Sequence, residues 1–149
     1  MSGSRVNVSR KFAAANRGLN QLSDLARDHA VEVGLDLQLI ELIKLRASQI
    51  NGCAACLATH TKVAIDNGET SQRLGTLAAW RGNRLFTDQE QAALELTEYV
   101  TLISDGHIDD ELYAELREHL SDDQIAAAAW VAIIINSFNR VSILNDNQP

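Results

Sequence analysis

Apolar and polar residues recur at helical spacing along almost the whole chain. Leu39, Leu42, Ile43 and Ile50, for example, fall on one face of a helix. The sequence contains no run of alternating apolar and polar residues of the kind that marks a strand. One Pro and eight Gly among 149 residues, with abundant Ala and Leu, also favour helix. We therefore predict an all-α fold of about seven helices in a single domain.

Helix start and stop signals divide this pattern. Asp36 has the form of a helix N-cap, and Thr87 with Glu90 and Ser121 with Gln124 have the form of capping boxes. The predicted helices run over residues 9–33, 36–50, 53–67, 71–80, 87–105, from 109 towards 120, and 125–144. The domain spans residues 1–149, with 1–8 and 145–149 expected as loose ends.

Composition narrows the possible partners and the cellular compartment. A net charge of -7 argues against nucleic acid, because phosphate binding needs a basic face. The N-terminus lacks the apolar segment of a secretory signal, and the longest apolar run, residues 125–135, is shorter than the roughly 20 residues that span a bilayer. We expect a cytoplasmic protein with no membrane partner. In that compartment paired cysteines are more often catalytic or metal-binding than structural.

The candidate chemistry is concentrated in Cys53-x-x-Cys56-x-x-x-His60, a CxxC motif at the predicted start of a helix. There, free backbone N–H groups and the helix dipole favour a thiolate. His60 lies four residues after Cys56, on the same helical face, where it can take the thiol proton. This gives a hypothetical cycle: Cys56 attacks an oxidant to form a sulfenic acid, and Cys53 condenses with it to a disulfide.

Other interpretations of these residues stay open at this point. Cys53, Cys56 and His60 are also three ligands for a metal-binding module, although structural zinc prefers four. A third interpretation is a catalytically silent helical scaffold that keeps the cysteines for packing. Glu41 lies twelve residues before Cys53, so spacing alone does not bring it to His60. It either orients the imidazole or pairs with Lys44 or Lys62 on a solvated face.

With Glu41 included, the motif resembles the AhpD-like alkylhydroperoxidase branch of the carboxymuconolactone decarboxylase superfamily. The similarity covers about Gly34 to Leu144. It includes Lys-Leu-Arg before the motif, Ala-Ser-Gln-Ile-Asn-Gly leading into Cys53, and three later segments at residues 77–81, 86–90 and 135–140.

This resemblance implies an all-helical homo-oligomer, often dimers packed into trimers or hexamers, that reduces hydroperoxides with no haem, metal or other cofactor. It implies that Cys56 attacks the peroxide, that Cys53 resolves the sulfenic acid, and that Glu41 and His60 relay protons. It also implies an external dithiol reductant of lipoyl or thioredoxin-like type. Ala55 departs from the pattern, because the best-known members have a relay histidine there. The decarboxylase branch typically lacks the cysteine pair, so decarboxylation is not expected.

Overall fold

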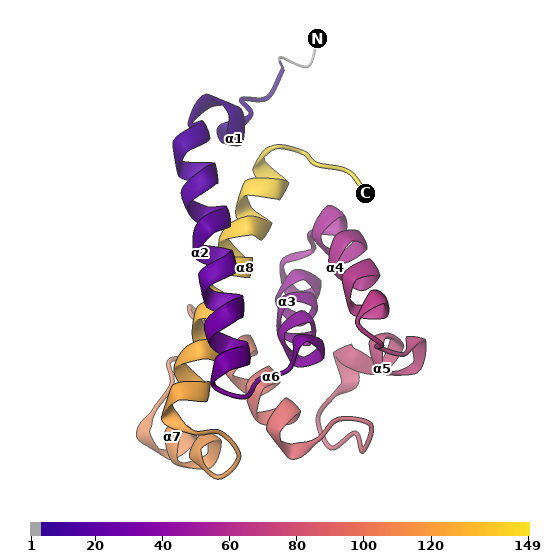
Figure 1. Ribbon diagram of the computed structural model, residues 1–149, viewed down its shortest axis with the longest axis vertical. Coiled ribbons are helices and arrows are strands. Elements are labelled where there is room, and N and C mark those ends of the chain that lie inside the picture. Colours follow the sequence, from indigo (N-terminus) through magenta and orange to yellow (C-terminus); the bar gives the residue numbers. More distant parts are fainter. Residues whose placement is uncertain (1–3) are drawn as a thin grey trace.

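The computed structural model describes residues 4–149, which form eight α-helices and one short 3-10 helix (Figure 1). The elements are α1 (Val8–Lys11), α2 (Ala13–Glu32), α3 (Leu37–Asn51), α4 (Ala54–Asp66), α5 (Ser71–Thr76), η1 (Leu77–Ala79), α6 (Asp88–Thr101), α7 (Asp110–Arg117) and α8 (Asp122–Leu144). Within residues 4–149 there is no strand. The predicted all-α class is therefore confirmed.

The predicted helix starts are confirmed by their side-chain hydrogen bonds. Asp36 Oδ1 accepts from the Leu39 backbone N–H at 2.7 Å and so caps α3. Both predicted capping boxes are complete: Thr87 with Glu90 opens α6, and Ser121 with Gln124 opens α8. Each cap satisfies backbone N–H groups that have no partner inside the helix.

The first predicted helix differs from the structure, because it breaks at Phe12 into α1 and α2. The break accompanies a contact between the two ends of the chain. The Val8 N–H donates to Asn145 Oδ1 at 2.8 Å, and Asn145 Nδ2 donates to Ser9 Oγ at 2.9 Å. Residues 1–3 of the predicted loose end lie outside the described part of the chain.

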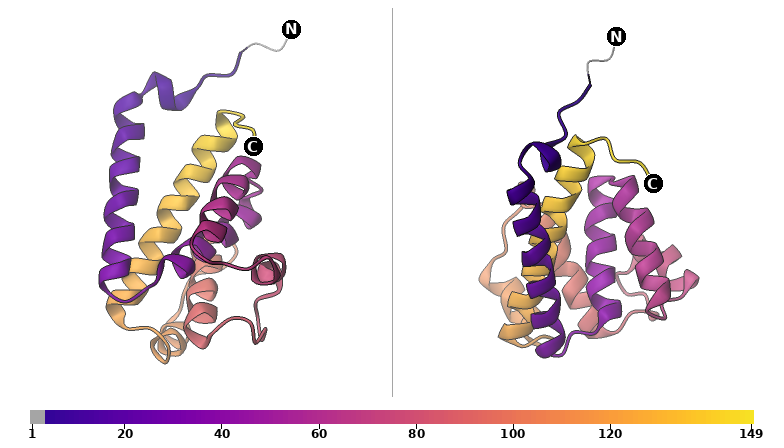
Figure 2. Two further views of the ribbon diagram at one scale, coloured as in Figure 1. Left: turned by 45° about the vertical axis from the view of Figure 1, so that its right-hand side comes forward. Right: turned by 45° about the horizontal axis from the view of Figure 1, so that its top comes forward.

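Helix α8 is the central element of the fold. It packs against α2, α3 and α6, and it lies beside α2 with the opposite chain direction (Figures 1 and 2). By length and composition α8 could also cross a membrane, and 44% of its most apolar window is buried inside the protein. Within the fold, α8 is packed against three other helices, as the core helix of a helical domain is.

Two clusters of buried apolar side chains hold the helices together. The larger cluster joins α2, α3, α6, α7 and α8, and Leu39, Leu96 and Val131 are among its members. The smaller one lies where α3, α4, η1 and α6 meet, around Leu42 and Trp80. Helix α3 contributes to both clusters, which fixes the position of its C-terminal end. That end leads directly into the cysteine motif.

Candidate active site

The junction between α3 and α4 is a tight turn that presents both cysteines. Gly52 ends α3 in the left-handed conformation, with φ of 68°, which glycine adopts without steric cost. The Cys53 N–H then donates to the Ser48 carbonyl at 3.1 Å. Cys53 is the N-cap of α4, and its Sγ accepts from the Cys56 N–H at 3.3 Å. The predicted break at Asn51-Gly52 and the predicted helix start at the motif are both confirmed.

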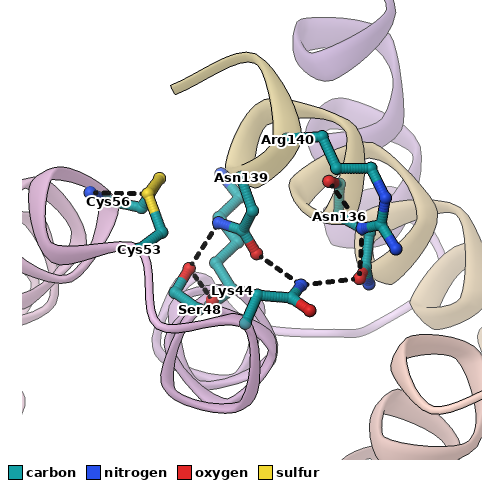
Figure 3. The surroundings of a disulfide bond; sticks show 8 residues. Lys44, Ser48, Cys53, Cys56, Asn136, Asn139 and Arg140 are labelled. Atoms are coloured by element: carbon teal, nitrogen blue, oxygen red, sulfur yellow. Dashed lines mark hydrogen bonds between the residues drawn. A yellow bond between two sulfur atoms is a disulfide. The ribbon is translucent and has the colours of Figure 1, made fainter. Parts of the chain in front are cut away.

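The two cysteines form a disulfide, with their Cα atoms 5.3 Å apart (Figure 3). They differ in their surroundings. Cys56 lines a cavity, whereas Cys53 is only 2% exposed and is not among the residues that line this cavity. Cys56 lies in the first turn of α4, where the helix dipole stabilises a negative charge. After reduction, Cys56 is therefore the sulfur that a small molecule in the cavity reaches first.

Glu41 and His60 meet across the interface of α3 and α4. His60 Nδ1 lies 2.8 Å from Glu41 Oε2, and Lys44 Nζ lies 3.3 Å from Glu41 Oε1. Glu41 is 5% exposed, so it does not lie on a solvated face. Its carboxylate thus holds one basic side chain on each oxygen.

These partners determine the protonation of the buried carboxyl group. Burial by itself raises the pKa of Glu41, but the hydrogen bond from His60 and the charge of Lys44 outweigh it, and the pKa lies below its ordinary value. Glu41 is therefore ionised at neutral pH and can only accept hydrogen bonds. His60 must then carry its proton on Nδ1, which leaves Nε2 free to accept one.

A cavity of about 380 Å³ lies between α2, α3, α4 and α8. Cys56, His60 and Lys44 line it from α3 and α4, and Ala55 lines it next to Cys56. A volume of roughly 300–1,000 Å³ is usual for pockets that bind small organic molecules. The cavity thus places the Cys56 sulfur and the His60 imidazole in one space large enough for a small organic molecule.

A network of polar side chains lies behind the cysteine turn and ties α3 to α8 (Figure 3). Asn139, which is fully buried, donates from Nδ2 to Ser48 Oγ at 3.0 Å, and Ser48 Oγ donates to the Lys44 carbonyl at 2.7 Å. Asn51 Nδ2 donates to Asn139 Oδ1 and Asn136 Oδ1 at 3.0 and 2.8 Å. The network fixes the second half of α3, which carries Lys44 and leads through Gly52 to Cys53, the N-cap of α4.

The structure brings all four predicted site residues, Glu41, Cys53, Cys56 and His60, to one place. Lys44 was considered in the sequence only as an alternative partner of Glu41; the structure gives Glu41 both Lys44 and His60. The spacing of three residues between Glu41 and Lys44 indicated that the two side chains are in contact. It did not indicate that Lys44 also lines a cavity. The polar network was also missed, because its members on α3 and its members on α8 are more than 80 residues apart in the sequence.

Within residues 4–149, no three His, Cys, Asp or Glu side chains gather in a way that could hold a metal ion.

Comparison with known proteins adds a family to this geometry. Residues 14–99 match the model of the carboxymuconolactone decarboxylase family. The chain belongs to that family. It is also 38% identical over 137 residues to the uncharacterized protein YdfG of Bacillus subtilis, with 92% of each chain covered. It is 35% identical over 86 residues to the uncharacterized protein YnjA of Escherichia coli, which covers 57% of this chain and 46% of YnjA.

Among solved structures, this carboxymuconolactone decarboxylase family member resembles a protein of unknown function from Agrobacterium tumefaciens. That protein has been suggested to be the antioxidant defence protein AhpD. The TM-score is 0.85 at 32% identity, and the match covers 98% of this chain and 97% of the other. The predicted membership of the AhpD-like branch is thus confirmed.

Proposed function

We propose that the protein is a thiol-dependent hydroperoxide reductase in which Cys56 attacks the peroxide and Cys53 resolves the product. One observation carries this proposal: Cys56 is disulfide-bonded to Cys53 and faces a cavity that it shares with His60, itself hydrogen-bonded to the buried Glu41. A redox-active pair, a base and an orienting acid are the groups that thiol peroxidase chemistry needs. The suggested AhpD role of the Agrobacterium tumefaciens protein supports the same activity.

The first step starts from the reduced dithiol. His60 Nε2 accepts the proton of the Cys56 thiol, while Glu41 holds the resulting imidazolium at Nδ1. The thiolate attacks the outer oxygen of the hydroperoxide, the O–O bond breaks, and Cys56 becomes a sulfenic acid. The alkoxide that leaves takes the proton from His60 and departs as an alcohol.

The second step closes the disulfide. The Cys53 thiolate attacks Cys56 Sγ, an S–S bond forms, and the sulfenic oxygen leaves as water after protonation. An external dithiol, of lipoyl or thioredoxin-like type, then reduces the disulfide by thiol–disulfide exchange and is itself oxidised. The cytoplasmic location expected from the sequence stays a prediction.

Ala55 fits a relay that uses fewer groups than the best-known relatives have. Its side chain lines the cavity next to Cys56 and cannot carry a proton. Proton transfer in this chain therefore depends on His60 and Glu41, which makes their contact across α3 and α4 essential to the proposed activity.

The test is a thiol titration of the reduced protein before and after addition of cumene hydroperoxide. We expect each chain to lose two thiols and to form one molecule of cumyl alcohol, and a dithiol to restore both thiols. Unchanged thiols in the wild-type protein would contradict the proposal.

The cysteine variants separate the two roles. Cys56→Ser should abolish turnover, because the sulfur that lines the cavity is gone. Cys53→Ser should stop after one turnover and accumulate a sulfenic acid on Cys56 that reacts with dimedone. Equal turnover in both variants and the wild type would show that neither cysteine has its assigned role.

A further inference from the structure

The charged groups that face the cavity are unevenly distributed. Lys44 and His60 line it, whereas none of the lining residues is Asp or Glu. Glu41 lies behind these two side chains and is hydrogen-bonded to both. A ligand in the cavity therefore meets the ammonium and imidazole groups first. Basic groups at the wall of the cavity contrast with the net charge of -7 of the whole chain.

Lys44 has hydrogen-bonding capacity left for a ligand. An ammonium group carries three N–H donors. Within residues 4–149, the hydrogen bond to Glu41 Oε1 is the one side-chain bond that Lys44 makes, so two donors are left. The Lys44 side chain is 15% exposed, and a hydrogen bond between an ammonium and a carboxylate is stronger in such a site than at an open surface.

The walls of the cavity differ in polarity. Ile134, Phe138 and Val141 of α8 form an apolar wall, which suits a hydrocarbon body. Asn16 and Asn20 of α2 line the cavity with side chains that are polar but carry no charge. Apart from Lys44 and His60, the cavity thus offers a ligand an apolar wall on α8 and uncharged polar groups elsewhere.

We infer that the cavity selects an organic hydroperoxide that carries a carboxylate, with Lys44 binding the carboxylate and α8 covering the hydrocarbon body. The inference rests on the proposed function and names its substrate class. The reaction balances as above: the O–O bond breaks, Cys56 is oxidised to the sulfenic acid, and the product is an alcohol that keeps the carboxylate. Hydrogen peroxide, which offers neither a charge nor an apolar body, should be a poor substrate.

The test compares two substrates of nearly the same shape, one charged and one neutral: cumene hydroperoxide with a para-carboxylate and the same molecule with a para-carboxamide. We expect kcat/KM of the wild-type protein to be about tenfold higher for the carboxylate, the size expected for one charged hydrogen bond. Lys44→Met keeps an apolar side chain of similar length and should bring the ratio to about one. Lys44→Arg keeps the charge and should restore the preference.

Lys62→Met is the matched control. Lys62 is an exposed lysine of α4 that pairs with Asp66 and does not line the cavity, so its loss should leave the ratio unchanged. A ratio near one in the wild-type protein, with normal loss of two thiols, would overturn this inference and leave the proposed function standing. A ratio that persists in Lys44→Met would also overturn it. No thiol loss with either substrate would overturn the proposed function and this inference together.

Discussion

At the scale of single residues, Glu41 carries a buried negative charge whose stability depends on pH. Its pKa is lower in the folded protein than the ordinary value of about 4.3, although burial opposes this. The stabilisation that the ionised Glu41 adds to the folded protein is therefore complete when the pH is above that ordinary value. It is lost as the pH falls through the lower pKa of the folded state. We expect Glu41→Gln to lower the free energy of unfolding by about 1–3 kcal/mol at pH 7. The deficit relative to wild type should shrink below about pH 4.3.

Urea unfolding of both proteins at pH 7 and pH 3.5 measures this difference. Asp66→Asn is the control, because it removes an exposed carboxylate that pairs with Lys62. It should stay within about 0.5 kcal/mol of wild type at both pH values. A Glu41→Gln deficit that grows in acid would contradict the direction of the pKa shift.

The sequence predicted the position of a site residue only where its contacts are with residues nearby in the chain. Cys56 and His60 are four residues apart on one helix, so their shared face followed from the sequence. The contact of Glu41 with His60 needs α3 and α4 to pack together, and the family resemblance suggested it where spacing could not. The cavity position of Lys44 depends also on α2 and α8, which are distant in sequence, so no local signal indicated it.

At the scale of helices, the polar network between α3 and α8 positions the cysteine turn. Asn139 is fully buried and bonds to Ser48 and Asn51 of α3. Asn139→Leu keeps the approximate volume but removes both bonds and leaves polar groups of α3 with fewer partners. We expect a loss of about 1–3 kcal/mol in the free energy of unfolding, measured with urea.

Ser137→Ala provides the comparison within the same helix. Ser137 makes one hydrogen bond, to the Ile133 carbonyl of its own helix, and it contributes nothing to the network. Its replacement should change stability by no more than about 0.5 kcal/mol. Equal stability of Asn139→Leu and Ser137→Ala would show that the network does not hold α3 to α8.

Helix boundaries were predictable where the cause lies in neighbouring residues. Capping boxes at Thr87 and Ser121 and the glycine at position 52 act within one turn, and the structure has each of them. No Gly or Pro next to Phe12 indicates in the sequence that the helix breaks there. It goes with the hydrogen bonds between Asn145 and the start of α1, which join residues more than 130 positions apart.

At the scale of the whole molecule, one apolar face lacks a partner within residues 4–149. Trp130 and Ile133 of α8 are 52% and 41% exposed, and Ile103, just after α6, is 62% exposed. Ile103 and Ile133 line the same surface depression. A group of large exposed apolar side chains on one face is typical of an interaction site. We propose that this α6–α8 face binds a second copy of the chain, which agrees with the homo-oligomer expected from the family resemblance.

Replacing Trp130 with Glu tests the proposal, because a charge at the centre of an apolar interface has to be desolvated without a partner. We expect the wild-type protein to give a multiple of 16.3 kDa by size-exclusion chromatography with light scattering, and Trp130→Glu to shift it towards 16.3 kDa. Ile65→Glu adds the same charge at a residue of almost equal exposure, 51%, on α4, which is not part of the α6–α8 face. It should keep the wild-type mass. A monomeric wild-type protein would end the self-association proposal, whereas a Trp130→Glu protein of unchanged mass would place the contact on another surface.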